Sequence, residues 1–164
     1  MRLRLSAAAV ALLGAACSDS PTGPTGPTPP RGVVVLNGFG QQGLTVVADT
    51  GTAAARLPFD ASFDGGAVEI ARDTALATSS RGGGDKLYVA DLATGATTTV
   101  QLPPRSNPGG AVFANGLGNA TVAVALRDSQ ALALVRLGAA PTITRVANVG
   151  RCPSDVVVQG GSFW

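Results

Sequence analysis

Beyond residue 32 the apolar residues occur in short runs and not at helical spacing. The runs are rich in Val, Ala and Thr, and Gly, Asp, Asn or Pro separates each run from the next. Short β-branched runs bounded by turn residues indicate strands, and no segment sustains the 3.6-residue period of an amphipathic helix. The sequence therefore predicts an all-β fold for residues 33–164.

Two successive segments contain four predicted strands each, in the same order, and a shorter segment flanks them on either side. In residues 64–104 the strands are predicted at Ala67–Ala71, Thr74–Thr78, Lys86–Leu92 and Thr97–Leu102, and in residues 107–150 at Ala111–Ala114, Thr121–Leu126, Ala131–Leu137 and Thr142–Val146. Residues 33–60 add Val33–Leu36, Leu44–Asp49 and Ala53–Leu57, and residues 152–164 add Asp155–Val158 and a second strand that begins in Gly160–Trp164.

A short motif at the start of these segments marks a repeat. Asn107-Pro108-Gly109-Gly110-Ala111-Val112-Phe113 has weaker copies in Asp64-Gly65-Gly66-Ala67-Val68-Glu69 and Cys152-Pro153-Ser154-Asp155-Val156-Val157. Gly110 follows Gly66 by 44 residues, Pro153 follows Pro108 by 45, and Leu132 follows Leu87 by 45; a shared Val-Ala-Asp recurs after 42. Periods of about 40–45 residues with several short strands each are typical of propeller blades.

The motif resembles the bacterial YVTN-type repeat of lactonase-like and surface-layer β-propellers. The resemblance is carried by Pro108–Val112, Leu87–Gly95 and Pro153–Val157. It implies four-stranded blades in a ring that usually has seven blades and closes by sharing one blade between the two chain ends. The 132 residues from Val33 to Trp164 would form about three blade equivalents, whereas closed propellers have typically 4–8 blades. We therefore expect a partial β-propeller whose first blade lacks its innermost strand.

The first 32 residues predict an exported and tethered protein. Arg2 and Arg4 precede a 12-residue apolar run, Leu5–Ala16, which has the length of a signal-peptide core and is too short for a membrane-spanning helix. Residues 1–16 are thus predicted to be removed as a signal peptide. The following Ser18–Gly32 holds five prolines and no large apolar side chain, so it predicts a disordered, extended tether of roughly 45 Å.

Leu12-Leu13-Gly14-Ala15-Ala16-Cys17 resembles the lipobox of bacterial lipoproteins. The resemblance implies that Cys17 carries the lipid and becomes the mature N-terminus. Gly14 stands where that family usually has an aliphatic residue, which leaves an ordinary signal-peptide cleavage near the same alanines as the alternative. Ser18 after the cysteine implies sorting to the outer membrane, if the cell has one. We expect a lipid-anchored protein of the cell envelope.

Charge and composition exclude several classes of function. Loss of Arg2 and Arg4 with the signal peptide reduces the 12 basic residues to 10, which balance the 10 acidic residues. A balanced chain with a single lysine lacks the positive field that gathers phosphate backbones, so nucleic acid is not an expected partner. The chain has no histidine, which removes the commonest general base and metal ligand, and no cofactor is expected.

The candidates for chemistry are correspondingly few. Glu69 is the only glutamate, and its position in a first strand makes it a weak candidate metal ligand; the alternative is a solvated carboxylate or one paired with Arg72. Cys152 is expected to be a small, partly buried residue before a strand. Asp64, Asp85, Asp91 and Asp128 are expected to cap turns, and the scattered phenylalanines to pack between blades. No catalytic residue is assigned.

Three functions stay open at this point. The preferred hypothesis is a non-catalytic binding or scaffold module that recognises an envelope protein or glycan. The first alternative is part of a lactonase-like propeller hydrolase, and the second is a truncated product without independent activity. An open stack of blades also exposes strand edges, so self-association into a composite ring is a further expectation.

Overall fold

A computed structural model describes residues 32–163 except 39, 52, 81–83, 115–119 and 160–161. All regular elements in these residues are strands. They are β1 (Gly32–Asn37), β2 (Gly43–Ala48), β3 (Ala53–Pro58), β4 (Gly65–Ala71), β5 (Thr74–Ser79), β6 (Lys86–Asp91), β7 (Thr97–Gln101), β8 (Pro108–Phe113), β9 (Thr121–Leu126), β10 (Ala131–Arg136), β11 (Thr142–Ala147), β12 (Val158–Gln159) and β13 (Ser162–Phe163). The predicted signal peptide, Cys17 and the tether up to residue 31 lie outside the described residues.

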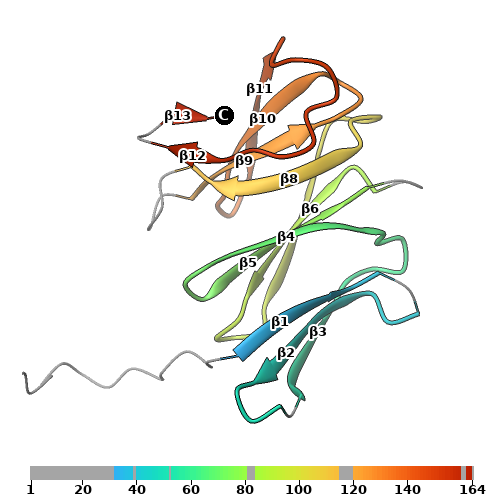
Figure 1. The fold of residues 1–164 in the computed structure, drawn as a ribbon, viewed down its shortest axis with the longest axis vertical. Coiled ribbons are helices and arrows are strands. Elements are labelled where there is room, and N and C mark those ends of the chain that lie inside the picture. The colour runs from blue at the N-terminus through green and yellow to red at the C-terminus, as the bar shows by residue number, and fades with distance from the viewer. Residues whose placement is uncertain are drawn as a thin grey trace, which may run out of the picture.

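The strands form three larger antiparallel sheets in which neighbours in sequence are neighbours in space. The first sheet has the order β1-β2-β3, the second β4-β5-β6-β7 and the third β8-β9-β10-β11, while β12 and β13 form a short hairpin. The three sheets are stacked along the long axis of the molecule (Figure 1). The all-β prediction is confirmed, and the eleven strands expected in residues 33–150 all form, with bounds that differ by at most three residues.

The second and third sheets repeat the same pairing pattern, but equivalent strands are not all the same distance apart in sequence. Lys86 pairs with Ser79 at the start of β6, and Ala131 pairs with Leu126 at the start of β10, so the third strands keep the 45-residue spacing while the second strands lie 47 residues apart. The first strands behave differently, because Gly65 and Pro108 occupy the matching ladder positions and lie 43 residues apart. The two Gly-Gly-Ala-Val segments, which align at 44, are therefore one residue out of register in the sheets.

A bulge in each first strand accompanies this shift. Between Gly65 and Val68, β4 advances three residues while β5 advances two, and β8 does the same between Pro108 and Ala111. A bulge adds twist and redirects the strand locally, and glycine tolerates the backbone geometry and close approach that it creates.

The main core lies between the second and third sheets. Alternate residues of each strand face the neighbouring sheet, as the two-residue period of a strand requires. The fully buried side chains include Leu76 and Leu87 from the second sheet and Val122, Val124 and Val135 from the third. Each sheet therefore depends on its neighbour to cover one apolar face.

An aromatic cluster joins the first and second sheets. The rings of Phe59 and Phe63, on the connection from β3 to β4, pack against Tyr88 of β6 with centroid distances of 4.3 and 5.2 Å. The Tyr88 hydroxyl donates to Asp60 at 2.6 Å, and the Lys86 ammonium lies 2.9 Å from the same carboxylate. The expected packing role of phenylalanine is confirmed for Phe59 and Phe63.

Buried hydroxyl groups connect the second sheet to the third. The Thr78 hydroxyl, completely buried, donates to the Gly109 carbonyl at 2.6 Å and accepts the Ala67 N–H at 3.1 Å. The neighbouring hydroxyl of Ser79, also buried, accepts the Asp64 N–H at 3.0 Å. These bonds satisfy backbone groups that the bulge in β4 and the start of β8 leave outside the ladders.

The segment after β11 differs from the prediction. A first strand was expected at Asp155–Val158, but residues 153–157 are irregular and only Val158–Gln159 is a strand. Pro153 has no N–H, and the Val156 N–H is taken by the Asp155 side chain at 2.8 Å, so a regular ladder does not form. The segment nevertheless runs beside β8, where the Gly110 N–H donates to the Ser154 carbonyl at 2.8 Å.

Glycine makes this close approach feasible. A β-carbon on Gly109 would collide with the Ser154 carbonyl oxygen, and one on Gly110 would collide with the Asp155 side chain. Val156 then packs against Ala123 and Leu132 on the second face of the third sheet. Gly109 and Gly110 thus form a contact point between the third sheet and the segment that follows it.

Replacement of Thr78 by Val tests the connection between the two sheets. Valine keeps the shape but removes the donor to the buried Gly109 carbonyl and the acceptor for the partly buried Ala67 N–H, leaving both backbone groups without these partners. We expect the free energy of unfolding to fall by about 2–4 kcal/mol, measured by urea denaturation followed by circular dichroism.

The matched control is Thr99→Val, because Thr99 is exposed on β7. This change should alter the free energy of unfolding by less than about 0.5 kcal/mol. Equal effects of the two substitutions would show that the Thr78 hydroxyl has no special part in joining the sheets.

Candidate functional site

The topology gathers several connections at one end of the sheets. In an antiparallel meander the start of the first strand, the turn from the second strand to the third and the end of the fourth strand all lie at the same end of the sheet. The residues before β4 and β8, and the β5–β6 and β9–β10 connections, therefore lie at the same end of the second and third sheets.

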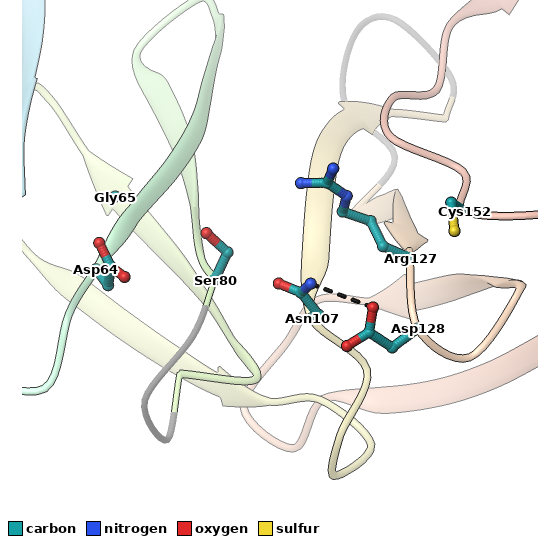
Figure 2. A pocket seen from close by; sticks show the side chains of 7 residues that line it. All are labelled: Asp64, Gly65, Ser80, Asn107, Arg127, Asp128 and Cys152. Carbon is teal, nitrogen blue, oxygen red and sulfur yellow. Dashed lines mark hydrogen bonds between the residues drawn. The ribbon is translucent and has the colours of Figure 1, made fainter.

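This end carries an open pocket of about 460 Å³. Figure 2 shows Asp64, Gly65 and Ser80 from the second sheet on one side and Asn107, Arg127 and Asp128 from the third sheet on the other. Cys152, from the segment that follows β11, completes the lining. The volume lies within the range of roughly 300–1,000 Å³ that is usual for small-molecule sites.

Three of the lining residues occupy equivalent positions in successive copies of the repeated motif. Asp64, Asn107 and Cys152 each stand immediately before the Gly-Gly, Pro-Gly or Pro-Ser step of the repeated motif, and we call them the leading residues. Asn107 and Cys152 also share a left-handed backbone, with φ of 47° and 49°. The repeat thus presents a different side chain from each unit to the same pocket: a carboxylate, an amide and a thiol.

The turn between β9 and β10 supplies a cation and a second acid. The Arg127 side chain extends into the space between the two sheets (Figure 2). Asp128 accepts a hydrogen bond from the Asn107 amide at 3.3 Å. Within the described residues the one ion pair joins Lys86 to Asp60, so Arg127 is paired with neither Asp64 nor Asp128. Its guanidinium donors face the pocket without a carboxylate partner.

Asp85 fixes the chain that leads into β8. Its carboxylate accepts the N–H groups of Arg105, Ser106 and Asn107 at 2.7–3.0 Å and the Ser106 hydroxyl at 3.1 Å. Burial by itself would raise the pKa of this carboxyl, but the hydrogen bonds from Asn107, Arg105 and Ser106 outweigh it, and the pKa lies below its ordinary value. Asp85 thereby holds the backbone of one leading residue in place.

Sequence reasoning anticipated only part of this arrangement. It expected aspartates to cap their own turns, and Asp91 does so by accepting the N–H groups of Ala93 and Thr94 at 2.9 Å. Asp85 instead caps a turn 20 residues away in the next connection. Arg127 and Ser80 were not identified as site residues; the signal that could have found them is their place next to the second-to-third-strand turns.

The predicted metal candidate lies elsewhere. Glu69 is exposed on β4 and does not line the pocket. The structure of the described residues holds no group of three or more His, Cys, Asp or Glu side chains that could bind a metal ion. The alternative pairing of Glu69 with Arg72 is not formed either, since neither residue takes part in the one ion pair of the described chain.

Cys152 also departs from its expected environment. The thiol is free and exposed at the pocket, whereas a partly buried residue was predicted. Cys152 has a left-handed backbone and lies in an irregular segment outside the sheets. Cys17, the predicted lipid-attachment residue, lies outside the described residues.

The described part of the chain contains no helix with the length and hydropathy that a membrane crossing needs. Comparisons with protein-family models, with curated proteins and with solved structures give no match to this chain. The chemistry of the pocket therefore has to be argued from its own residues: hydrogen-bond donors on Arg127, Ser80 and Asn107, and acceptors on Asp64 and Asp128. This set is equipped to bind a polar ligand.

Asp85→Asn tests how the pocket is held. The folded-state pKa of Asp85 is depressed, so its contribution to stability is complete above the unfolded-state pKa near 3.9 and is lost as the pH falls through the folded-state value. At pH 7 the free energy of unfolding should fall by about 1–3 kcal/mol in Asp85→Asn. The difference from the unmodified protein should shrink when urea denaturation is repeated below about pH 4.

Asp49→Asn is the control, because Asp49 is exposed after β2 at the other end of its sheet. Its substitution should leave both the stability and the pH profile nearly unchanged. A pH-independent difference for Asp85→Asn would contradict the role of the ionised carboxylate.

Proposed function

We propose that this chain is a lipid-anchored β-propeller-repeat protein of the cell envelope that acts as a binding module and not as a catalyst. The observation that carries the proposal is the convergence of the leading residues Asp64, Asn107 and Cys152 on one polar pocket. A repeat that exposes its variable position at a shared cavity is suited to recognition.

The blade interpretation rests on connectivity and contact. Each of the two complete sheets is a four-stranded up-and-down meander, and such sheets are the unit of a propeller. Their first strands are neighbours, since β8 lies against both β4 and β5. The segment that follows β11 approaches β8 at the Gly110–Ser154 hydrogen bond, which extends the same sequence of first strands. These features support three successive blades around a common inner edge.

The envelope location is proposed from the N-terminal sequence. A basic start, an apolar run, the lipobox-like segment before Cys17 and the proline-rich residues 18–32 together favour export, lipidation at Cys17 and a spacer between membrane and propeller. Such a spacer would leave the pocket free to reach a partner in the envelope, either a protein or a glycan.

Lipidation predicts a specific labelling pattern. When the full-length chain is expressed in a bacterium fed an alkyne-tagged palmitate, the protein should acquire the label and sediment with membranes. Cys17→Ser should lose both properties, because the acylated thiol is removed. Cys152→Ser, the matched control at the other cysteine, should keep both; label retained in Cys17→Ser would refute the anchor.

Binding to the envelope predicts a saturable interaction. The full-length protein in mild detergent should bind isolated cell-envelope material to saturation, and Arg127→Ala should weaken the affinity roughly tenfold because an unpaired guanidinium in a pocket can form strong charge-assisted hydrogen bonds. Arg136→Ala removes an exposed arginine at the opposite end of β10 and should bind normally. Non-saturable binding, or equal binding by all three proteins, would contradict the proposed function.

A further inference from the structure

The hydrogen-bonding groups of the pocket limit the chemistry of its ligand. Arg127 offers only donors, Asp64 and Asp128 offer only acceptors, and the side chains of Ser80 and Asn107 offer both. Asn107 uses one amide hydrogen on Asp128, which leaves its carbonyl oxygen and second N–H available. A ligand that satisfies this lining must carry many small groups that both donate and accept.

The mixed charges of the lining disfavour strongly ionic ligands. The two carboxylates and one guanidinium sum to one negative charge, so a phosphate or sulfate group would meet two acids for each cation. A cationic ligand would meet Arg127 in the same space. No ion pair within the described residues occupies Arg127. A neutral ligand with hydroxyl groups can therefore accept hydrogen bonds from the guanidinium and donate hydrogen bonds to the carboxylates at the same time.

We propose that the pocket binds a neutral saccharide unit, and that the leading residues Asp64 and Asn107 select it. This inference rests on the proposed binding function and names the ligand class for the same site. Vicinal hydroxyl groups supply donors to a carboxylate and acceptors to a guanidinium or amide at neighbouring positions of one ring. The open pocket of about 460 Å³ leaves room for one end of a longer glycan to continue into solvent.

The shared repeat position explains how selectivity would arise. The leading residues reach the pocket from separate units, and the backbone of Asn107 is fixed by the Asp85 carboxylate. Each unit can therefore change one hydrogen-bonding group without altering the ladders that hold the sheets. In this interpretation Cys152 is a third, weakly polar position beside the saccharide.

The test measures calorimetric binding of three oligosaccharides to the full-length protein in mild detergent: the neutral cellotetraose and tetra-N-acetylchitotetraose, and the acidic trigalacturonate. We expect at least one neutral probe to bind with a Kd below about 1 mM, and trigalacturonate to bind at least tenfold more weakly. Asp64→Asn and Asn107→Ala should each weaken the neutral probe about tenfold, whereas Asp49→Asn should not change it.

The outcomes separate this inference from the proposed function. Saturable envelope binding together with no response to either neutral probe at about 10 mM would overturn the saccharide assignment and leave the binding module intact. Preference for trigalacturonate, or unchanged affinity in folded Asp64→Asn and Asn107→Ala, would also overturn it. Failure to bind both the envelope and the saccharides would reject both proposals, and folding of each variant is verified by circular dichroism.

Discussion

The structure depends on the close contact of the second sheet with the first strand of the third. A four-stranded sheet buries only one layer of side chains against each neighbour, so an isolated unit would leave an apolar face in water. The Thr78 hydroxyl reaches across this contact to the Gly109 carbonyl and is completely buried there. Since the carbonyl has moved out of its own ladder at a bulge, the contact between sheets and the local shape of β8 require each other.

The same constraint explains the small residues of the repeated motif. Gly109 and Gly110 have no side chains to separate β8 from residues 154–155, and the pairing of Gly110 with Ser154 continues the row of first strands. Polar side chains of the pocket lie just beyond this contact, since Asn107 precedes the buried Pro108 and lines the pocket at the end of the sheets.

Carboxylates in the connections between strands hold neighbouring units together. Asp85, in the connection before β6, secures the turn that leads to Asn107, and Asp60, in the connection before β4, binds Tyr88 of the second sheet. Each carboxylate therefore links consecutive units from a loop. In the pocket, Arg127 lies across from Asp64 without an ion pair between them (Figure 2).

The sequence by itself determined the strands and their order, because β-branched runs broken by glycine, proline and aspartate leave few alternatives to antiparallel meanders. It also revealed the three copies of the motif, but the equivalence of Asp64 and Asn107 follows from the 43-residue register of the sheets and not from the 44-residue sequence spacing. Only the tertiary structure decided the one-residue register shift in β8, the irregular path of residues 153–157, the long-range capping by Asp85 and the exposure of Cys152. Each of these depends on contacts between residues distant in the chain, where bulges and competing hydrogen bonds override local preference. For that reason Arg127 comes to line a pocket with residues of another sheet only when the sheets are stacked.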